Sequence, residues 1–404
     1  MVSRRNMLKL GAGCCTGVFL PNILHANTPT IKLGEINSYI PELEKVQTPY
    51  RHGWLLALEE INERGGIKGR KLEIISRNDE GDPDKATSLA NFLVEKEGVN
   101  FLFGSVLSNI ALALSKAANE MQIPFLATET RSDSITWEEG GKYTFSMRPN
   151  TYMVTKMLVN EAARLPVNRW ACIAPDYEFG HTAVQHFKNN MNQVRPDIQW
   201  VHDEWAPLFK MDRNQLIKRM KDKNIEAIFN ATFADDLQKL LNVNTQEKFF
   251  EGKSVVSLFS GEPEYIEAVS SPICDSWIVT GYPWQQIKTN AHMAFVKKYQ
   301  SRFAESPTHS ALSGYIALNA IAAAYQNSDD GTPDTLIKAM ENLYFDSPLG
   351  TIRFRAQDRQ SSMGTFVGKL AYFEGKSHMR DWYYADGADY WHGNSQVRLI
   401  RPQQ

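Results

Sequence analysis

The chain has 404 residues, 43% of them hydrophobic, which exceeds the needs of one simple domain and suffices for two sizeable cores. Its formal net charge is -2, and it has neither the basic stripe that would indicate nucleic-acid binding nor an acidic tail. The 9 Trp, 15 Tyr and 20 Phe provide side chains that fill cores and also line ligand clefts.

The first 26 residues predict an export signal rather than part of the fold. Arg4 and Arg5 precede a weakly apolar run, 11–20, which is shorter than the roughly 20 residues that span a bilayer. This pattern is typical of a twin-arginine signal peptide (residues 1–26), and it predicts a periplasmic protein. A basic N-terminal helix on a cytosolic protein and a lipoprotein anchored through Cys14 are the alternatives.

Removal of this signal would take Cys14 and Cys15 with it and leave Cys172 and Cys274. These two lie in or beside apolar runs that resemble the first and last strands of one α/β unit, so they are unlikely neighbours in an open sheet. We therefore predict buried free thiols, with a single disulfide as the alternative in an oxidising compartment.

The mature sequence opens with alternating strand-like and helix-like segments. After a strand at 31–36, a helix is predicted to begin with Thr48 as N-cap and Pro49 as its first residue. It should end at the glycine pair 65–66, and a second strand, a helix capped by Asp82, a third strand and a third helix follow. This β-α-β-α-β order indicates a parallel sheet with helices on both faces.

The segment 100–120 changes character in its middle. The apolar run 101–103 predicts a strand, and a small, hydroxyl-rich turn leads from it into a helix whose N-cap we expect to be Ser108. The first amides of such a helix have no partner inside it and therefore attract an anion.

The same alternation restarts near Asn168 and continues to about Thr280. Strands are expected at 169–175, 198–205, 225–231, 254–260 and 277–282, and helix-rich sequence resumes at 290–325. Two similar α/β units predict a ligand cleft between them, because ligands of doubly wound sheets bind outside the carboxyl ends of the strands.

The run from Gly53 to Ala86 resembles the periplasmic type I solute-binding proteins of the leucine/isoleucine/valine-binding family. The matching pieces are the helical residues 59–62, the turns 65–67 and 69–72, Asp79 and the pair 82–83, and the likeness extends over most of the mature chain. The resemblance implies an α/β fold of two doubly wound parallel-sheet lobes joined by three crossovers, near 148–149, 281–284 and 347–350. Lobe 1 would comprise 27–148 plus 282–347, and lobe 2 would comprise 149–281 plus 348–404.

The resemblance also implies a site on lobe 1. Ser108 matches the family serine that bonds a ligand carboxylate, and the amide of Asn109 lies beside it; the alternative is that Ser108 only caps its helix. In the next loop, Glu129 and Arg131 replace a small residue and a threonine of the family. Either the loop is shifted and Thr130 or its neighbour Thr128 serves instead, or the ligand is not a plain aliphatic amino acid. A solvent-exposed Glu129/Arg131 pair is the structural alternative.

On lobe 2, Phe179 matches a family aromatic that packs on the ligand, with Tyr177 as its alternative. Phe233 lies where the family often has another aromatic, and Glu262 matches the acidic residue that pairs with a ligand ammonium. Packing in the core is the alternative for either Phe, and an acid at a helix start is the alternative for Glu262.

Two aromatic positions are predicted to flank the ligand outside these matches. Tyr39 lies in a loop that departs from the family after the first strand, and Trp284 lies beside an expected crossover. The aromatic tail 380–393 is predicted to pack over lobe 2, with docking on a partner as the alternative.

Catalytic motifs are absent from the sequence: it has no H-E-x-x-H, G-x-S-x-G, P-loop or C-x-x-C pattern. We therefore predict a solute-binding protein, not an enzyme, without metal or cofactor, that acts as a monomer and delivers a small ligand to the membrane permease of an ATP-driven importer. A branched-chain or related amino acid is the family's usual ligand; an aromatic acid, amide or urea-like ligand is the rival. A ligand sensor of the same fold and an exported hydrolase remain as alternatives.

Overall fold

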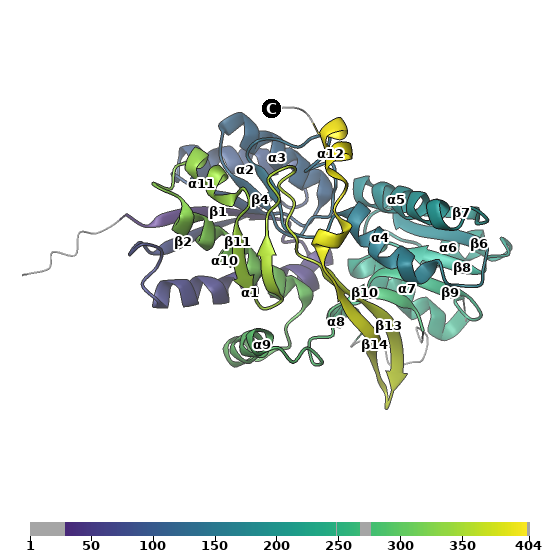
Figure 1. Ribbon diagram of the computed structural model, residues 1–404. Helices are drawn as coiled ribbons and strands as arrows, with labels where there is room; N and C mark the ends of the chain where they lie inside the picture. The colour runs from purple at the N-terminus through teal and green to yellow at the C-terminus, as the bar shows by residue number, and fades with distance from the viewer. Residues whose placement is uncertain (1–28, 248, 267–275, 402–404) are drawn as a thin grey trace, which may run out of the picture.

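The computed structural model describes residues 29–247, 249–266 and 276–401, and it has an α/β fold built on two large sheets (Figure 1). The first sheet is parallel, with the strand order β2-β1-β3-β4-β5. Its strands are β1 (Ile31–Asn37), β2 (Leu72–Asn78), β3 (Leu102–Gly104), β4 (Phe125–Ala127) and β5 (Thr144–Ser146). The parallel sheet predicted from the alternation of strands and helices is confirmed.

The second sheet has the order β14-β13-β10-β9-β8-β6-β7. Strands β6 to β10 run parallel, whereas β13 and β14 from the C-terminal region add antiparallel pairs and extend beyond the sheet as a long hairpin (Figure 1). Its strands are β6 (Arg169–Pro175), β7 (Gln199–Ala206), β8 (Ala227–Asn230), β9 (Ser254–Gly261), β10 (Ile278–Gly281), β13 (Thr365–Phe373) and β14 (Lys376–Ala385).

Helices cover both sheets, which buries the apolar strands on both faces (Figure 1). Around the first sheet lie α1 (Glu44–Glu63), α2 (Pro83–Glu95), α3 (Ser108–Met121), α9 (Asn290–Phe303), α10 (His309–Asn327) and α11 (Pro333–Met340). Around the second lie α4 (Thr151–Ala162), α5 (Glu178–Val194), α6 (Arg213–Met220), α7 (Ala234–Glu247) and the short α8 (Pro263–Ile266). Asp82 and Asp212 cap α2 and α6 through their side chains, as the sequence predicted.

The first long helix begins earlier than the sequence predicted. A 3-10 turn, η1 (Pro41–Leu43), leads directly into α1 at Glu44, so Thr48 is not its N-cap and Pro49 lies inside the helix. Proline there removes one backbone hydrogen bond. The first turn of α1, before Thr48, is helical and buries the Val46 side chain, which stabilises this earlier start.

Helices α1 and α10 approach each other closely through two glycines. A Cβ atom on Gly53 would lie 1.9 Å from the carbonyl oxygen of Ala311, and one on Gly314 would lie 2.3 Å from that of Tyr50. Any side chain at either position would force the helices apart, so the glycines fix how α10 covers the first sheet.

The chain passes between the two sheets after β5, after β10 and before β13. The third passage differs from the predicted position at 347–350, which falls in the turn of a hairpin formed by β11 (Tyr344–Ser347) and β12 (Gly350–Arg353). Beyond that hairpin, Gln360 still forms a bridge to Ser146 at the end of β5. The chain therefore reaches the second sheet only at β13.

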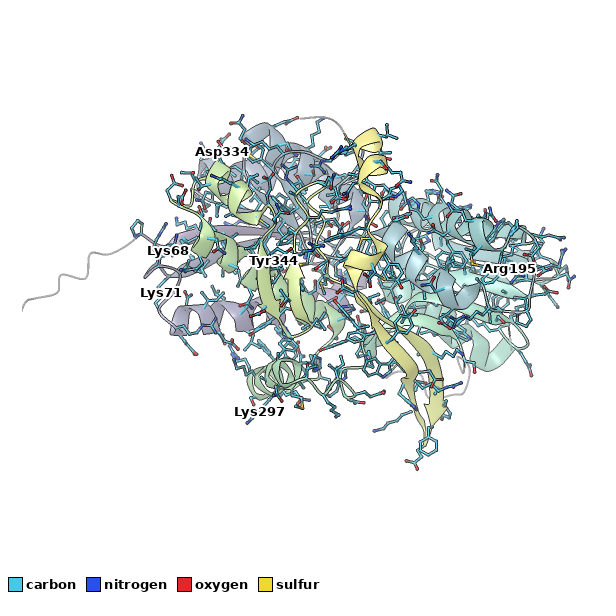
Figure 2. All side chains as sticks on the ribbon, in the orientation of Figure 1. Lys68, Lys71, Arg195, Lys297, Asp334 and Tyr344 are labelled. Atoms are coloured by element: carbon cyan, nitrogen blue, oxygen red, sulfur yellow. The ribbon has the colours of Figure 1, made fainter. Side chains whose placement is uncertain are left out.

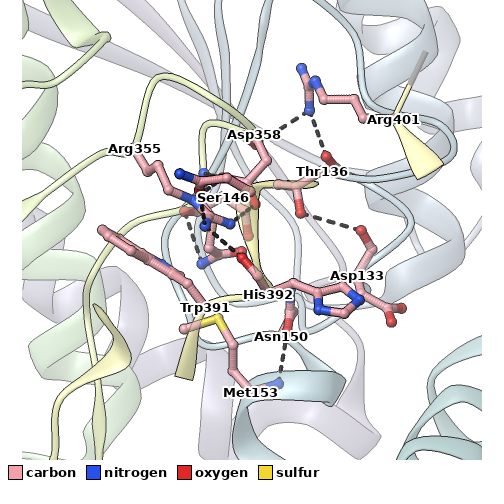
Figure 3. A network of polar contacts seen from close by, with 12 residues as sticks. Asp133, Thr136, Ser146, Asn150, Met153, Arg355, Asp358, Trp391, His392 and Arg401 are labelled. Carbon is pink, nitrogen blue, oxygen red and sulfur yellow. Dashed lines mark hydrogen bonds and ion pairs between the residues drawn. The ribbon is translucent and has the colours of Figure 1, made fainter. Parts of the chain in front are cut away.

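The C-terminal segment connects both halves of the molecule. After β14 it continues through η3 (Gly387–Tyr390) to α12 (Asn394–Ile400). The Arg401 guanidinium then donates to the carbonyl oxygen of Thr136 over 2.6 Å, in the loop after β4 (Figure 3). It also donates to the carbonyl oxygen of Gly141 in the same loop over 2.8 Å. The His392 ring packs against Trp137, with 4.9 Å between ring centroids. The aromatic tail thus packs within the molecule, but against both halves rather than over the second sheet alone.

The cysteines agree with the prediction as far as the structure describes them. Cys172 in β6 is a buried free thiol, and burial raises its pKa well above the ordinary value. Strands β8 and β9 separate β6 from β10, so the two cysteine-bearing runs are not neighbours. Cys14, Cys15, Cys274 and the predicted signal peptide lie outside the described residues.

Candidate ligand-binding site

A cavity lies between the two sheets. Its walls come from the segments that follow β3, β4, β6, β8 and β9, the carboxyl ends of parallel strands, where ligands of such sheets bind. The lining residues are Val46, Val106, Ser108, Glu129, Arg131, Arg148 and Ser310 on the first side, and Tyr177, Phe179, Phe233, Phe259, Glu262, Glu264 and Tyr265 on the second.

Polar contacts join the two sides of this cavity. Ser132 donates to Oε1 of Glu178 over 2.6 Å, and Nζ of Lys45 donates to Oε1 of Gln238 over 2.9 Å. Each contact connects a residue beside the first sheet to a residue beside the second. The structure is therefore a closed arrangement, in which a ligand in the cavity would be enclosed by both sides.

One half of the cavity is aromatic. The Phe179 ring lies 5.8 Å from Phe233 and 5.9 Å from Phe259, centroid to centroid, and Tyr177 packs beside them at 6.1 Å from Phe179. Phe259 has a φ of 66°, a left-handed conformation that aromatic residues rarely adopt. Strain of this kind often marks functional sites, and here it accompanies a ring that forms part of the cavity wall.

The other half holds a buried network of charges centred on Glu262. Its Oε1 atom lies 3.4 Å from Arg148, 3.8 Å from Arg131 and 3.3 Å from Nδ1 of His309. Burial by itself would raise the pKa of Glu262, but His309 and the two guanidinium groups outweigh burial and lower this pKa to about 2. Glu262 is therefore ionised and already has cationic partners within the protein.

Glu129 completes this network through different partners. One carboxylate oxygen lies 3.2 Å from Arg148, and the other accepts a hydrogen bond from Ser310 over 2.6 Å. Glu129 and Arg131 are both buried. The alternative of a solvent-exposed Glu129/Arg131 pair is therefore excluded, and the partner of Glu129 is Arg148.

Arg131 is the cation in the cavity wall that is left incompletely paired. Its side chain is 3% exposed, yet neither terminal nitrogen has a hydrogen-bond partner among the described residues. The guanidinium lies over the Phe259 ring, 4.8 Å from the centroid. Burial, and then the charge of Arg148, lower its pKa to about 9, so it is protonated at neutral pH but lacks acceptors. An acceptor supplied by a ligand would satisfy these donors.

Ser108 lies in the cavity wall, though not as a helix cap. The N-cap of α3 is Leu107, and Ser108 is the first helical residue, buried, with its Oγ 3.3 Å from Oγ1 of Thr130. Its hydroxyl and the free amides of the first turn of α3 are still placed at the positive end of a helix. The predicted N-cap role is wrong, because the backbone turns helical one residue earlier than expected.

The remaining predicted residues divide into two groups. Phe179, Phe233 and Glu262 line the cavity with Ser108, Glu129 and Arg131. Four others do not line it: the Asn109 side chain is exposed, Thr130 lies behind Ser108, the Tyr39 hydroxyl donates to Glu35 over 3.0 Å, and Trp284 lines grooves beside α9 and β14.

Several lining residues were missed from the sequence. Arg148 precedes Pro149 at an expected crossover. Segments that join two lobes border the cleft between them, so this position could have predicted Arg148 as a lining residue. Phe259 is in an apolar strand-like run, and Ser310 lies in a helical segment whose sequence is typical of the hydrophobic core. No local pattern separates these two from ordinary packing residues.

Two features of the described residues bear on the class of site. Across the described ranges, which omit residues 1–28, 248, 267–275 and 402–404, no group of three or more His, Cys, Asp or Glu side chains is arranged to hold a metal ion. In the same ranges, none of the helices combines the length and apolar character required to cross a membrane. Charged side chains outside the cleft, such as Lys68, Lys297 and Asp334, lie at the periphery of the molecule (Figure 2).

Comparisons with known proteins agree with this architecture. Leu/Ile/Val-binding protein homolog 8 of Brucella abortus is 24% identical over 355 residues, which cover 83% of this chain and 86% of the relative. A solute-binding protein of an ABC transporter from Rhodopseudomonas palustris BisB5, solved with 3,4-dihydroxybenzoic acid, superimposes with a TM-score of 0.78 at 20% identity and covers 88% of this chain and 98% of that one.

Two other solved structures have the same fold. The leucine-, isoleucine-, valine-, threonine- and alanine-binding protein of Brucella ovis, in a closed conformation, matches with a TM-score of 0.76 at 17% identity, covering 90% of this chain and 97% of that one. A periplasmic binding protein of Burkholderia mallei matches with a TM-score of 0.81 at 14% identity, covering 91% of this chain and 98% of that one. The family model of the periplasmic binding proteins matches residues 30–376, and this chain therefore belongs to that family.

Proposed function

We propose that this protein is the exported solute-binding component of an ATP-driven importer, and that it captures a small aromatic carboxylate in the cleft between its sheets. The single observation that carries the ligand class is Arg131, a buried guanidinium that lines the cavity and whose terminal nitrogens have no hydrogen-bond acceptor among the described residues. A ligand carboxylate supplies two acceptor oxygens in the geometry that a guanidinium binds bidentately.

The pairing of Glu262 argues against a ligand ammonium at that position. In the resemblance, this acid pairs with the ammonium of an amino acid, whereas here Arg131, Arg148 and His309 surround it. An ammonium next to Glu262 would also lie close to two guanidinium groups, which would repel it. Arg131 therefore takes the place of the ligand's positive charge, and a carboxylate without an ammonium fits better.

The aromatic half supports a ring on that carboxylate. Phe179, Phe233 and Phe259 present edges and faces on which a ligand ring can pack. Solved solute-binding proteins of the same fold were crystallised with 3,4-dihydroxybenzoic acid, benzoate and 4-hydroxybenzoate, which supports the proposal. The first turn of α3, with Ser108, would provide a second contact for the carboxylate.

A branched-chain amino acid is the second candidate, favoured by the curated relatives described as Leu/Ile/Val-binding homologues and by the retention of Ser108 and Glu262. In either case the closed lobes would be recognised by a membrane permease, with the solute bound and released unchanged. We propose export by the twin-arginine route, with residues 1–26 as the signal, and a periplasmic protein that acts as a monomer.

A ligand screen by thermal shift and calorimetry of the mature protein tests this function. A ligand that binds only the folded state raises the melting temperature by mass action. We expect benzoate, its hydroxylated derivatives or phenylacetate to raise it and to bind with micromolar or lower Kd. Stabilisation by leucine, isoleucine or valine, but by no aromatic acid, would transfer the assignment to the second candidate.

A further inference from the structure

Glu264 is a second incompletely paired group in the same cavity, and the proposed function leaves it unused. It lies in α8 and lines the cavity two residues after Glu262. Its Oε2 atom is buried and has no hydrogen-bond partner among the described residues. A buried oxygen without a partner carries the full cost of its lost hydration, so a ligand group that reaches it gains a partner at no further desolvation cost to the protein.

The surroundings of Glu264 favour its neutral form. Burial raises the pKa of its carboxyl well above the ordinary value, and the negative charges of Glu262 and Glu129 raise it further. A protonated carboxyl group can donate one hydrogen bond and accept others, whereas a carboxylate only accepts. A hydrogen bond with the Glu262 carboxylate also favours the neutral form and engages the Glu264 carboxyl, so the unpartnered Oε2 atom suits a ligand group that donates a hydrogen bond.

The charged groups around the cavity favour some ligand groups over others at Glu264. Arg131 and Arg148 lie 3.8 and 3.4 Å from the Glu262 carboxylate, whose charge, with that of Glu129, acts on Glu264. Because the two guanidinium groups balance these two carboxylates, a ligand ammonium at a neutral Glu264 would lose its hydration without gaining a net opposing charge, and a second ligand carboxylate would face the charge of Glu262. A hydroxyl group is neutral, donates one hydrogen bond and accepts two, and meets neither penalty.

We propose that Glu264 determines specificity by hydrogen-bonding a hydroxyl group on the ligand ring, so that the preferred solutes are hydroxy-substituted aromatic acids. This inference rests on the proposed capture of an aromatic carboxylate at Arg131, and it adds the second recognition point. Glu262 and Glu129 act on the ligand only indirectly, by holding the two arginines and keeping Glu264 protonated.

Calorimetric titration of the mature protein with benzoate, the three monohydroxybenzoates and the corresponding methoxybenzoates tests the inference. In the wild type, at least one hydroxybenzoate should bind 10-fold or more tightly than benzoate, a difference of about 1.4 kcal/mol. A methoxy group cannot donate and should lose most of this gain.

Glu264→Met removes both hydrogen-bonding oxygens. It should bring the hydroxybenzoate to within about 2-fold of benzoate and leave the benzoate affinity within about 3-fold of wild type. Glu264→Gln keeps a donor and an acceptor without an ionisable group, and it should retain part of the preference between pH 6 and 8. Glu120→Met, at the far end of α3 on the exposed surface, is the matched control and should change nothing.

The outcomes separate the inference from the function on which it rests. Binding of benzoate with no preference for a hydroxyl, retention of the preference in Glu264→Met, or tighter binding of an amine-substituted acid would each overturn the role of Glu264 and leave the function standing. No binding of any aromatic acid would overturn both. Should Glu264→Met fail to melt cooperatively, Glu264→Gln decides: a partial loss of the hydroxyl preference with the benzoate affinity kept supports the inference, and an unchanged preference or a uniform loss for all ligands refutes it.

Discussion

Substitution of Arg131 by methionine separates ligand recognition from folding more sharply than any other change in the cavity. Methionine keeps an unbranched apolar chain of similar reach over Phe259, where the guanidinium lies 4.8 Å from the ring centroid, and removes the charge. Glu262 keeps Arg148 and His309, at 3.4 and 3.3 Å, so its carboxylate is not left unpaired.

The expected loss of affinity follows from the burial of Arg131. Removing one partner of a buried, hydrogen-bonded charge pair costs about 2–5 kcal/mol of binding free energy, which corresponds to about 30-fold to several thousand-fold in Kd. Arg131→Lys should fall between, because an ammonium keeps the charge but loses the bidentate fork.

The stability of the ligand-free protein should hardly change. The unpaired N–H groups of Arg131 cost about 1–3 kcal/mol, and the contact with the Phe259 ring returns about 0.5–2 kcal/mol. The net change is at most about 2.5 kcal/mol, which corresponds to about 3 °C for a chain of this length. Arg131→Met should therefore melt near the wild type, or slightly above it.

Calorimetry with the best aromatic acid and a thermal melt without ligand test both parts. Arg164→Met is the matched control, because Arg164 is an exposed arginine paired with Glu161 on the surface. Wild-type affinity in Arg131→Met would refute the assignment of this residue to the ligand carboxylate. A fall in melting temperature of 8 °C or more without ligand would show that Arg131 instead stabilises the fold.

Three further substitutions test the charge network at Glu262, the buried carboxyl of Glu35 and the contact across the cleft. Glu262→Gln should destabilise the protein by about 3–5 kcal/mol in a denaturant melt, because Arg131 loses its buried counter-charge and Arg148 keeps only Glu129; a change under 1 kcal/mol would contradict the network. Burial raises the pKa of Glu35 to about 7, so the folded state holds an extra proton between its unfolded pKa, near 4.5, and pH 7. Stability is therefore greatest below pH 4.5 as far as this group is concerned and falls by about 3 kcal/mol as pH rises through 7. Glu35→Gln should flatten that slope in melts from pH 4.5 to 8, and an unchanged slope would refute the assignment. Ser132→Ala removes the donor to Glu178 across the cleft and should weaken ligand binding about 5- to 100-fold, mainly through faster release measured by surface plasmon resonance; an unchanged dissociation rate would mean that the contact does not hold the closed form.

The sequence predicted much of the site through the family resemblance, and the strand order explains why the predicted residues meet. Ser108, Arg131, Phe179 and Glu262 all follow parallel strands, and the carboxyl ends of such strands gather at one edge of a sheet, so their meeting in one cleft needs no side-chain detail. The prediction was weaker for Tyr39, because the direction of a loop side chain depends on its hydrogen-bond partner, here Glu35.

What the sequence by itself determined about this protein is its architecture and family. The alternation of apolar strands and amphipathic helices dictates parallel sheets covered on both faces, and the run 53–86 carries the family resemblance. The charge balance of the cleft was decided only by the tertiary structure. Glu129 pairs with Arg148 rather than with Arg131, and Glu262 is met by His309 from 47 residues away. Such pairings depend on distances of a few ångströms between segments that the fold alone brings together, and they leave the terminal nitrogens of Arg131 without a hydrogen-bond acceptor among the described residues.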